Sequence, residues 1–455
     1  MSGMETQDPP PALRATSPRR GEDVGPQTQE PPPALSATSP RVPRGEDVEP
    51  RHRQPWGVLR SGPFRNLWVA GSLSLIGDFF SYVAIAWLVL QLTGSSLALG
   101  SVLIVQAIPR GVLMVVGGAI SDRLSPRIAM LASMGLRVAL VAPLAVVVLT
   151  GHVQMWEVYG ISFVFGVVDA FFMPARSSIL PRLVADNQLE AGNAVLNVSG
   201  QVSIVVGPAL AGLVVATAGT GWAFAADAAC FAVGVLFVLW LPKPAQVKAA
   251  GATEPERGLG GQIIAGLRYA WADVGIRATL IIIAAIDFGA NGALSVGLPT
   301  LAHDRFGEGA AGFGILLGAW GVGATAGALA AGMVRRPERM GWIMVAVCLW
   351  FGVTIGAVGL IPTLAPAAIV MAVSGIASGA VNTFGISWLQ RRTDPAMQGR
   401  VMSLVMLASM GLVPVSYALS GLIADLNVTL LFVGSGVLML VTAVVAAASR
   451  TVRSI

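Results

Sequence analysis

Six ionisable side chains lie inside long apolar stretches of the sequence, where a charge needs a partner. They are Asp78, Arg110, Arg137, Asp169, Asp227 and Asp287. A charged side chain at the centre of a bilayer costs about 2.5–3.5 kcal/mol even on the mildest insertion scale, so such residues pair with each other or face a water-filled cavity. The chemistry that these residue types support is proton exchange and ion pairing, and no nucleophile, base and metal constellation accompanies them.

Asp78 lies about midway along its apolar stretch, and Arg110 and Arg137 lie about midway along the two stretches that follow. Equal depth predicts an ion pair between Asp78 and Arg110, with Arg137 competing for the same carboxylate. Two interpretations stay open for this cluster. Either Asp78 exchanges a proton when its distance to an arginine changes, or the pair is a static strut, because stranding one member of a buried pair costs about 3–5 kcal/mol.

The other acids have alternatives as well. Asp287 and Asn291 are one helical turn apart and would share a helix face. We expect them to line the opposite wall of a cavity, unless Asp287 is itself the coupling carboxylate. Asp169 lies near the expected inner end of its stretch, and Asp227 lies in the outer half of its stretch. Each is predicted to be an access-path residue, a snorkelling side chain or an interhelical hydrogen-bonding group.

The elements that must hold these residues are apolar stretches of about 20 residues, each long enough to cross a ~30 Å hydrocarbon core. Of the 455 residues, 55% are hydrophobic and only 12% charged, against about 25% charged in soluble domains, which excludes an ordinary soluble enzyme. Backbone groups in lipid must be satisfied within the segment, so we predict helices. They are 65–91, 97–120, 128–150, 155–174, 194–216, 222–241, 277–301, 312–334, 341–361, 365–388, 401–424 and 428–448.

The basic residues predict how these helices are oriented. Arginine and lysine gather in alternate connections, for example at Arg127, Arg182 and Arg392, whereas the opposite connections hold His152 and Arg305 and little else. The positive-inside rule then places both termini in the cytoplasm, and an even number of spans agrees. A chain of this kind is expected in the bacterial cytoplasmic membrane, in contact with lipid.

Composition also divides the chain. Residues 1–55 are Pro-rich and internally repeated, so we predict a disordered cytoplasmic tail, with a docking role for it as an alternative. An N-terminal six-helix half (56–241), a cytoplasmic linker (242–276) and a C-terminal six-helix half (277–455) follow. Within the linker, 259–273 is amphipathic enough for an interfacial helix. Asp78-Phe79 and Asp287-Phe288 stand at matching places in the two halves.

One connection carries a recognisable motif. The stretch Gly118-Ala-Ile-Ser-Asp122-Arg123-Leu-Ser-Pro-Arg127 is similar to the loop signature GxxxDRxGRR, with Ser125 and Pro126 departing from it. On this basis 60–448 resembles the major facilitator superfamily. The resemblance implies an all-α integral membrane fold of twelve transmembrane helices in two six-helix, pseudo-symmetric halves, and it implies that Gly118, Asp122, Arg123 and Arg127 form an inner gate. The alternative is an ordinary positively charged loop.

Two further stretches resemble branches of that superfamily. The fifth span resembles the superfamily's exporter signature, with several of its glycines replaced, and this resemblance implies efflux. The matching positions are Ser203, Gly207, Pro208, Ala211 and Gly212. The alternative is that these small residues serve only close helix packing. Pro174-Ala-Arg176, Leu180-Pro-Arg182 and Gln390-Arg-Arg392 are similar to enterobactin exporters and macrolide efflux permeases.

Aromatic and methionine side chains near mid-span are candidates for a substrate cavity, because flat rings and flexible thioethers suit a permissive amphipathic ligand. Ordinary core packing is the alternative for each. The candidates are Phe79, Tyr82, Phe172, Met173, Phe288, Trp320 and Trp388.

The function that these features favour is export of a small amphipathic compound, drug-like, macrolide-like or siderophore-like, by proton antiport with alternating access. We expect a monomer whose partners are the substrate and protons. There is no GxxxxGK[ST] loop for ATP, no basic stripe for nucleic acid, and no metal or cofactor motif, since Cys230 and Cys348 lie in apolar runs. The alternatives are an uptake symporter or uniporter, and a non-transporting membrane scaffold or sensor.

Overall fold

Residues 55–121, 125–242, 267–333, 339–394 and 397–453 are described by a computed structural model, and they belong to the unit Gln54–Ile455. Nearly all of the predicted tail, most of the predicted linker, and the motif residues Asp122 and Arg123 lie outside these ranges. Of the predicted interfacial helix 259–273, residues 267–272 are helical, and residues 259–266 also lie outside the described ranges.

The described residues hold twelve helical segments long and apolar enough to cross a membrane, which confirms the predicted number. Ten of these segments contain one long helix, and the seventh and eleventh are each divided. In chain order the helices are α1 (Gly62–Thr93), α2 (Ser96–Ser121), α3 (Pro126–Leu149), α4 (Met155–Ile179), α5 (Leu189–Ala218), α6 (Thr220–Leu239), α8 (Val274–Gly292), α9 (Leu298–Asp304), α10 (Gly309–Met333), α11 (Met340–Val358), α12 (Leu364–Arg392), α13 (Gln398–Gly411), α14 (Val413–Leu426), α15 (Val428–Ala448) and α16 (Arg450–Arg453).

The predicted boundaries are close to these, with one informative difference at α4. The helix continues past residue 174 to Ile179, and the half-buried Arg176 side chain lies against the backbone of α1. A Cβ atom added to Gly71 would lie 3.0 Å from Arg176 Nε, so the glycine leaves the room that this side chain occupies. A basic residue beside an apolar stretch therefore does not always mark the end of the membrane-spanning helix.

The division of the seventh segment has a visible cause. Ser416 of α14 donates from its hydroxyl to the Phe288 carbonyl at 2.6 Å and accepts the Gly292 N–H at 3.0 Å. Those two backbone groups would bond each other in an undisturbed α-helix, so the hydroxyl is inserted into the ladder. One π-helical stretch, Ala293–Gly297, follows at once. In the eleventh segment, Pro414 lacks the N–H that would continue the ladder across the break between α13 and α14.

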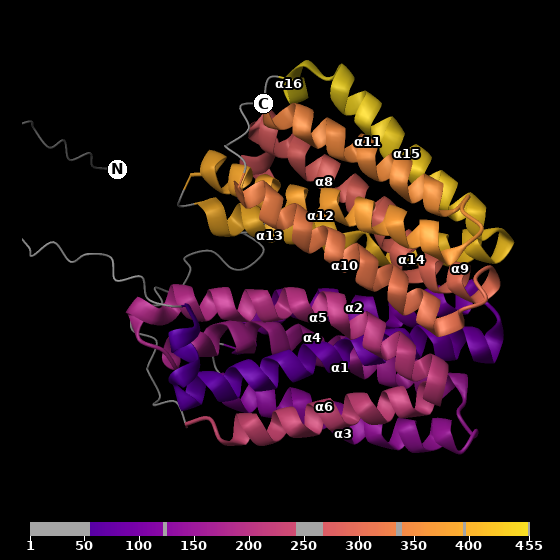
Figure 1. The fold of residues 1–455 in the computed structure, drawn as a ribbon. Coiled ribbons are helices and arrows are strands. Elements are labelled where there is room, and N and C mark those ends of the chain that lie inside the picture. The colour runs from indigo at the N-terminus through magenta and orange to yellow at the C-terminus, as the bar shows by residue number, and fades with distance from the viewer. Residues whose placement is uncertain (1–54, 122–124, 243–266, 334–338, 395–396, 454–455) are drawn as a thin grey trace, which may run out of the picture. The chain divides into compact units, whose positions relative to one another are not determined.

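The helices pack as two groups, which Figure 1 shows in indigo to rose and in rose to yellow. In the first group, α1 packs on α5 and α6, α2 on α4, and α3 on α4 and α6. In the second group, α8 packs on α13, α14 and α15, α10 on α12, and α11 on α12 and α15. Two pairs of helices, α5 with α10 and α2 with α14, provide the main contacts between the groups.

Both connecting pairs approach closely through glycine. A Cβ atom at Gly212 of α5 would lie 2.6 Å from the Ala310 carbonyl of α10, and one at Gly100 of α2 would lie 2.6 Å from the Tyr417 carbonyl of α14. All four positions lie toward the helix ends where the connections contain little arginine; we call this the arginine-poor end and the opposite one the arginine-rich end. The groups are thus joined near the arginine-poor end.

Hydrogen bonds reinforce that junction. Asp425, at the last turn of α14, accepts from the Ser95 hydroxyl at 2.8 Å, from the Leu97 N–H at 3.1 Å and from the Ser96 N–H, all at the start of α2. The hydroxyls of Ser96 and Thr300 lie 2.9 Å apart. A carboxylate from one group therefore caps a helix of the other, where it also meets the positive end of the helix dipole.

Candidate functional site

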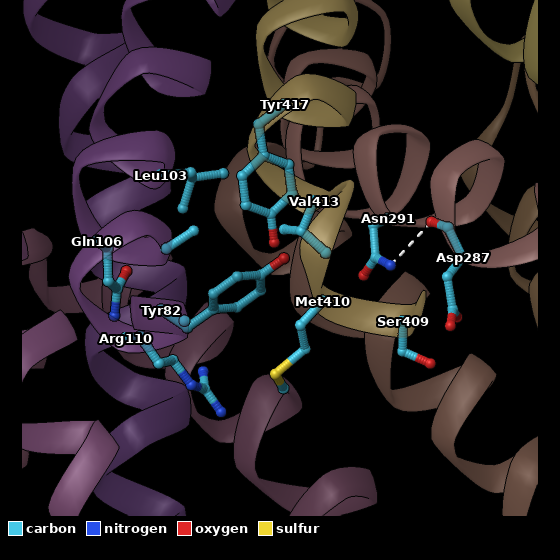
Figure 2. Close-up of a pocket in the computed structure, with 12 residues that line it drawn as sticks. Tyr82, Leu103, Gln106, Arg110, Asp287, Asn291, Ser409, Met410, Val413 and Tyr417 are labelled. Atoms are coloured by element: carbon cyan, nitrogen blue, oxygen red, sulfur yellow. Dashed lines mark hydrogen bonds between the residues drawn. The ribbon is translucent and has the colours of Figure 1, made fainter. Parts of the chain in front are cut away.

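A cavity of about 350 Å³ lies between the two groups of helices (Figure 2). Helices α1 and α2 line it from the first group, and α8, α13 and α14 line it from the second. Its polar side chains are Tyr82, Gln106, Arg110, Asp287, Asn291, Ser409 and Tyr417. The volume is at the low end of the range for small-ligand sites.

The two walls of this cavity differ in charge. Figure 2 shows Arg110 and Gln106 on α2 on one side and Asp287 and Asn291 on α8 on the other, with the ring of Tyr82 between them. The Asn291 amide donates to the Asp287 carbonyl at 2.8 Å, as expected for residues one turn apart. The structure therefore brings Asp287 and Asn291 to the wall opposite the first group.

A second cavity, of about 400 Å³, shares Asp287, Asn291 and Ser409 with the first. It extends among α8, α10, α11, α12 and α13 and thus lies inside the second group. We call it the annex. Trp320 of α10, predicted as a cavity residue, lines the annex and not the cavity between the groups.

The charge cluster of the first group is centred on Arg137 of α3. One guanidinium nitrogen lies 2.5 Å from Asp78 Oδ1, and another pairs with Asp169. Arg110 reaches Asp169 only at 3.8 Å. The predicted ion pair between Asp78 and Arg110 is therefore wrong, and the competing partner Arg137 takes its place. Depth along a span could not decide this, because it does not say which helices are neighbours.

Burial distinguishes the members of the cluster. The Arg137 side chain is 3% exposed, whereas those of Asp78 and Asp169 are 40% and 18% exposed. The guanidinium also lies over the rings of Phe231 at 4.9 Å and Phe172 at 5.5 Å. Such cation–π contacts help a buried cation where water is excluded. Arg137 is thus held in place, and Asp78 is the carboxylate most open to its surroundings.

Asp227 is fully buried and makes a different contact. Its carboxylate accepts from the Ser81 hydroxyl of α1, and its other oxygen has no hydrogen-bond partner in the described part of the chain. A Cβ atom at Gly77 would lie 2.6 Å from Asp227 Oδ1. Of the predicted roles for Asp227, the geometry corresponds to an interhelical hydrogen-bonding group. Asp169, in contrast, belongs to the Arg137 cluster and not to the inner end of its helix.

Several predicted cavity residues pack elsewhere. Phe172 is 2% exposed and belongs to the core around Arg137. Phe79 packs against α5, since a Cβ atom at Gly207 would lie 2.7 Å from its ring. Phe288 and Trp388 line neither cavity, and Trp388 instead lies 5.5 Å from the Arg392 guanidinium at the arginine-rich end. The Met173 side chain lies outside the described residues.

The exporter-like positions on α5 serve close packing. Ser203 bonds back to the Ser199 carbonyl at 2.9 Å, and Ala211 is fully buried. Pro208 contributes its carbonyl to the contact with Gly314 of α10. Pro208 and Gly212 therefore build the α5–α10 junction, whereas Gly207 lies against Phe79 of α1. None of the exporter-like positions lines the described cavities.

Of the four predicted gate residues, the structure describes Gly118, in the last turn of α2, and Arg127, in the first turn of α3. Arg127 donates to the carbonyls of Val238 at 3.2 Å and Leu239 at 2.7 Å. It thus satisfies the C-terminal end of α6, where a cation also interacts favourably with the helix dipole.

Sequence reasoning missed three polar residues of the cavity: Gln106, Ser409 and Tyr417. A signal existed for two of them, because Gln106 and Tyr417 are polar side chains inside apolar spans. Nothing local indicated that α13 and α14 would face α2, since that depends on packing between distant segments.

The sequence matches the transmembrane secretion effector family over residues 53–454. It is 27% identical over 383 residues to the multidrug efflux pump Tap of Mycolicibacterium fortuitum, a match covering 80% of this chain and 90% of the relative. It is 25% identical over 359 residues to the enterobactin exporter EntS of Escherichia coli O81 (strain ED1a), covering 77% and 83%.

Solved structures resemble the fold. A mutant of the peptide transporter POT in complex with alafosfalin has a TM-score of 0.69 at 13% identity, covering 87% of this chain and 97% of the other. The nucleoside transporter NupG has a TM-score of 0.68 at 16% identity, covering 85% and 99%. At these identities the likeness concerns the fold alone. The relatives and the structural neighbours are transporters and not enzymes.

Proposed function

Because the chain belongs to the transmembrane secretion effector family of efflux proteins, we propose that it exports small amphipathic compounds across the bacterial cytoplasmic membrane by proton antiport. It is a multi-pass membrane protein of a family whose named relatives export small molecules. The observation that carries the proposal is the cavity between the two helix groups, which has a cation on one wall and a carboxylate on the other.

The proposed topology has both termini and the arginine-rich end in the cytoplasm. In that orientation the close junctions of α5 with α10 and of α2 with α14 lie on the outer side. The cavity then belongs to an inward-facing state, which is the state in which an exporter loads its substrate. Lipid surrounds the spans, and the protein acts as a monomer.

The recurrence of helix pairs supports two pseudo-symmetric halves, 56–241 and 277–455, joined by the linker 242–276. Taking α8, α10, α11, α12, α13–α14 and α15 as counterparts of α1 to α6, the same pairs pack together in both groups. Alternating access then consists of the two halves rocking about the cavity. Gly118, Asp122, Arg123 and Arg127 would latch the inner side, and the packed α5 would be the pivot.

Asp78 is our candidate for the proton carrier. Arg137 holds it at 2.5 Å in this state, and 40% of its side chain is exposed, so water can deliver and accept a proton there. A change in the distance to Arg137 changes how strongly the carboxylate holds a proton, because an adjacent cation favours the ionised form. Asp169 shares the same guanidinium and keeps Arg137 from being stranded when Asp78 is protonated.

Transport and coupling are tested in everted membrane vesicles with an imposed proton gradient. Ethidium, erythromycin and enterobactin are added in turn, and a pH-sensitive dye reports whether any of them discharges the gradient. We expect discharge by at least one compound in wild-type vesicles and its loss in Asp78→Asn, with the protein still inserted. A substrate that enters the vesicles without discharging the proton gradient indicates a uniporter, and full coupled export by Asp78→Asn excludes Asp78 as the obligatory carrier.

Asp169→Asn is the matched control for that experiment. It removes the other carboxylate on the same guanidinium while leaving the 2.5 Å contact between Arg137 and Asp78. If the role of these acids is only to neutralise a buried arginine, the two variants lose coupling equally. If Asp78 carries the proton, Asp169→Asn retains measurable coupling.

A further inference from the structure

The annex is lined mainly by apolar side chains, although it opens at a carboxylate. Apolar surface comes from Ile286 of α8, from Leu294 of the π-helical stretch Ala293–Gly297, and from Val347 and Phe351 of α11. Trp320 contributes a flat ring from α10. Asp287 lies where the annex meets the cavity between the groups, because it lines both. An apolar chamber with one charged group at its entrance suits an amphipathic ligand.

Asp287 differs from the other carboxylates of the site in its partners. Asp78 and Asp169 are both paired with Arg137, whereas no arginine, lysine or histidine in the described part of the chain lies within ion-pair distance of Asp287. Ser409 of α13 lines the same two cavities as Asp287. A carboxylate at this depth without a cation is costly to keep ionised, so a ligand that brings its own positive charge gains from binding there.

The volume of the annex limits the size of the apolar part. A cavity of about 150 Å³ binds a benzene molecule, and the annex has about 400 Å³. Two to three fused rings therefore fit by volume. The Trp320 ring offers them a stacking partner.

We propose that the annex is the binding site for the ring system of the exported compound and that Asp287 binds its protonated amine. The substrate class is thus an organic cation with a body of two or three fused rings. This inference rests on the proposed export function, and it makes Asp287 a substrate-binding residue instead of the coupling carboxylate.

The test is direct binding to purified full-length protein in detergent, with two probes of equal ring size. 9-Aminoacridine is cationic at neutral pH and acridine is neutral, and the fluorescence of both reports binding. We expect wild-type protein to bind the cationic probe at least tenfold more tightly than the neutral one. Asp287→Asn should remove that preference while changing the affinity for acridine by less than threefold.

Filling the annex with a larger side chain should weaken the binding of both probes to the same extent. Val347→Phe places a ring inside the annex from α11, and we expect about a tenfold loss of affinity for each probe. Val353→Phe is the matched control on the same helix, because Val353 is 61% exposed and does not line the annex. It should leave both affinities unchanged. If Val347→Phe does not give a monodisperse protein, Val381→Phe fills the annex from α12 instead.

The inference is overturned if a folded annex-filling variant binds both probes as tightly as wild type, or if Asp287→Asn keeps the preference for the cation. Efflux of 9-aminoacridine from cells expressing the same variants separates this result from the proposed function. Efflux of 9-aminoacridine without annex-dependent binding refutes the annex as the binding site and leaves the export proposal intact. Annex-dependent binding without efflux of any compound supports the site and overturns the export proposal.

Discussion

Removing the Asp425 carboxylate should loosen the junction between the two helix groups at the arginine-poor end. The carboxylate caps α2 from the opposite group, through Ser95 at 2.8 Å, Leu97 at 3.1 Å and Ser96. Loss of a helix cap costs about 0.5–2 kcal/mol, and loss of a negative charge at a helix N-terminus costs about 0.3–1 kcal/mol. Because these bonds join the groups, the cost falls on the state in which this end is closed.

We expect Asp425→Ala to destabilise that closed state by about 1–2 kcal/mol, which changes the ratio of closed to open molecules by roughly 5- to 30-fold. Spin labels at Leu92 and Leu426, which are 42% and 76% exposed at that end, report the separation of the groups. Both native cysteines, Cys230 and Cys348, are replaced first. The distance distribution between the labels should shift toward longer separations in the variant.

Glu157→Ala is the matched control. Glu157 accepts the Gln154 N–H at 2.9 Å and so caps α4, but both residues belong to the same group. This variant loses a cap of the same kind without losing a bond between the groups, and its distance distribution should match wild type. An Asp425→Ala distribution indistinguishable from that of Glu157→Ala would refute the assignment of Asp425 to the junction.

Three further outcomes are expected. Arg137→Gln should lower the thermal stability of the detergent-solubilised protein by about 3–5 kcal/mol, because it strands carboxylates inside the first group; a thermal shift no larger than that of a surface substitution contradicts this. Gly212→Leu should destabilise the α5–α10 junction by about 1–3 kcal/mol and impair export, since even a Cβ atom there would lie 2.6 Å from the Ala310 carbonyl; normal export and stability would show that the junction yields. At the arginine-rich end, burial acts to raise the pKa of Asp273, but the Ile276 N–H and Arg392 outweigh it and lower that pKa below its ordinary value of 3.8. The ion pair between Asp273 and Arg392 is half-exposed, so it stabilises the fold by less than about 1 kcal/mol. This stabilisation is complete above pH 3.8 and is lost as the pH falls through the lowered pKa of Asp273. Acid titration of unfolding in wild type and Asp273→Asn measures this loss, and identical unfolding profiles would contradict the prediction.

The fold was largely predictable because its main determinants are local. Twelve spans followed from apolar length alone, and the predicted ends lie within a few residues of the helix ends. The clearest differences are that α4 ends at Ile179 and not at 174, and that α5 begins at Leu189 and not at 194. Arg176 lies within α4 and packs against α1 at Gly71. The break after Gly292 had no local signal, because a hydroxyl from α14 causes it.

For the site, the sequence by itself determined which residues are chemically unusual, since an ionisable side chain in an apolar span is visible without a structure. It marked Asp78, Arg137 and Asp287 in this way. Only the tertiary structure decided that Arg137 and not Arg110 binds Asp78, that Phe172 packs in the core, and that an annex opens beside Asp287. Pairing and cavities depend on which helices are neighbours and how they are rotated, and those are set by contacts between segments far apart in the chain.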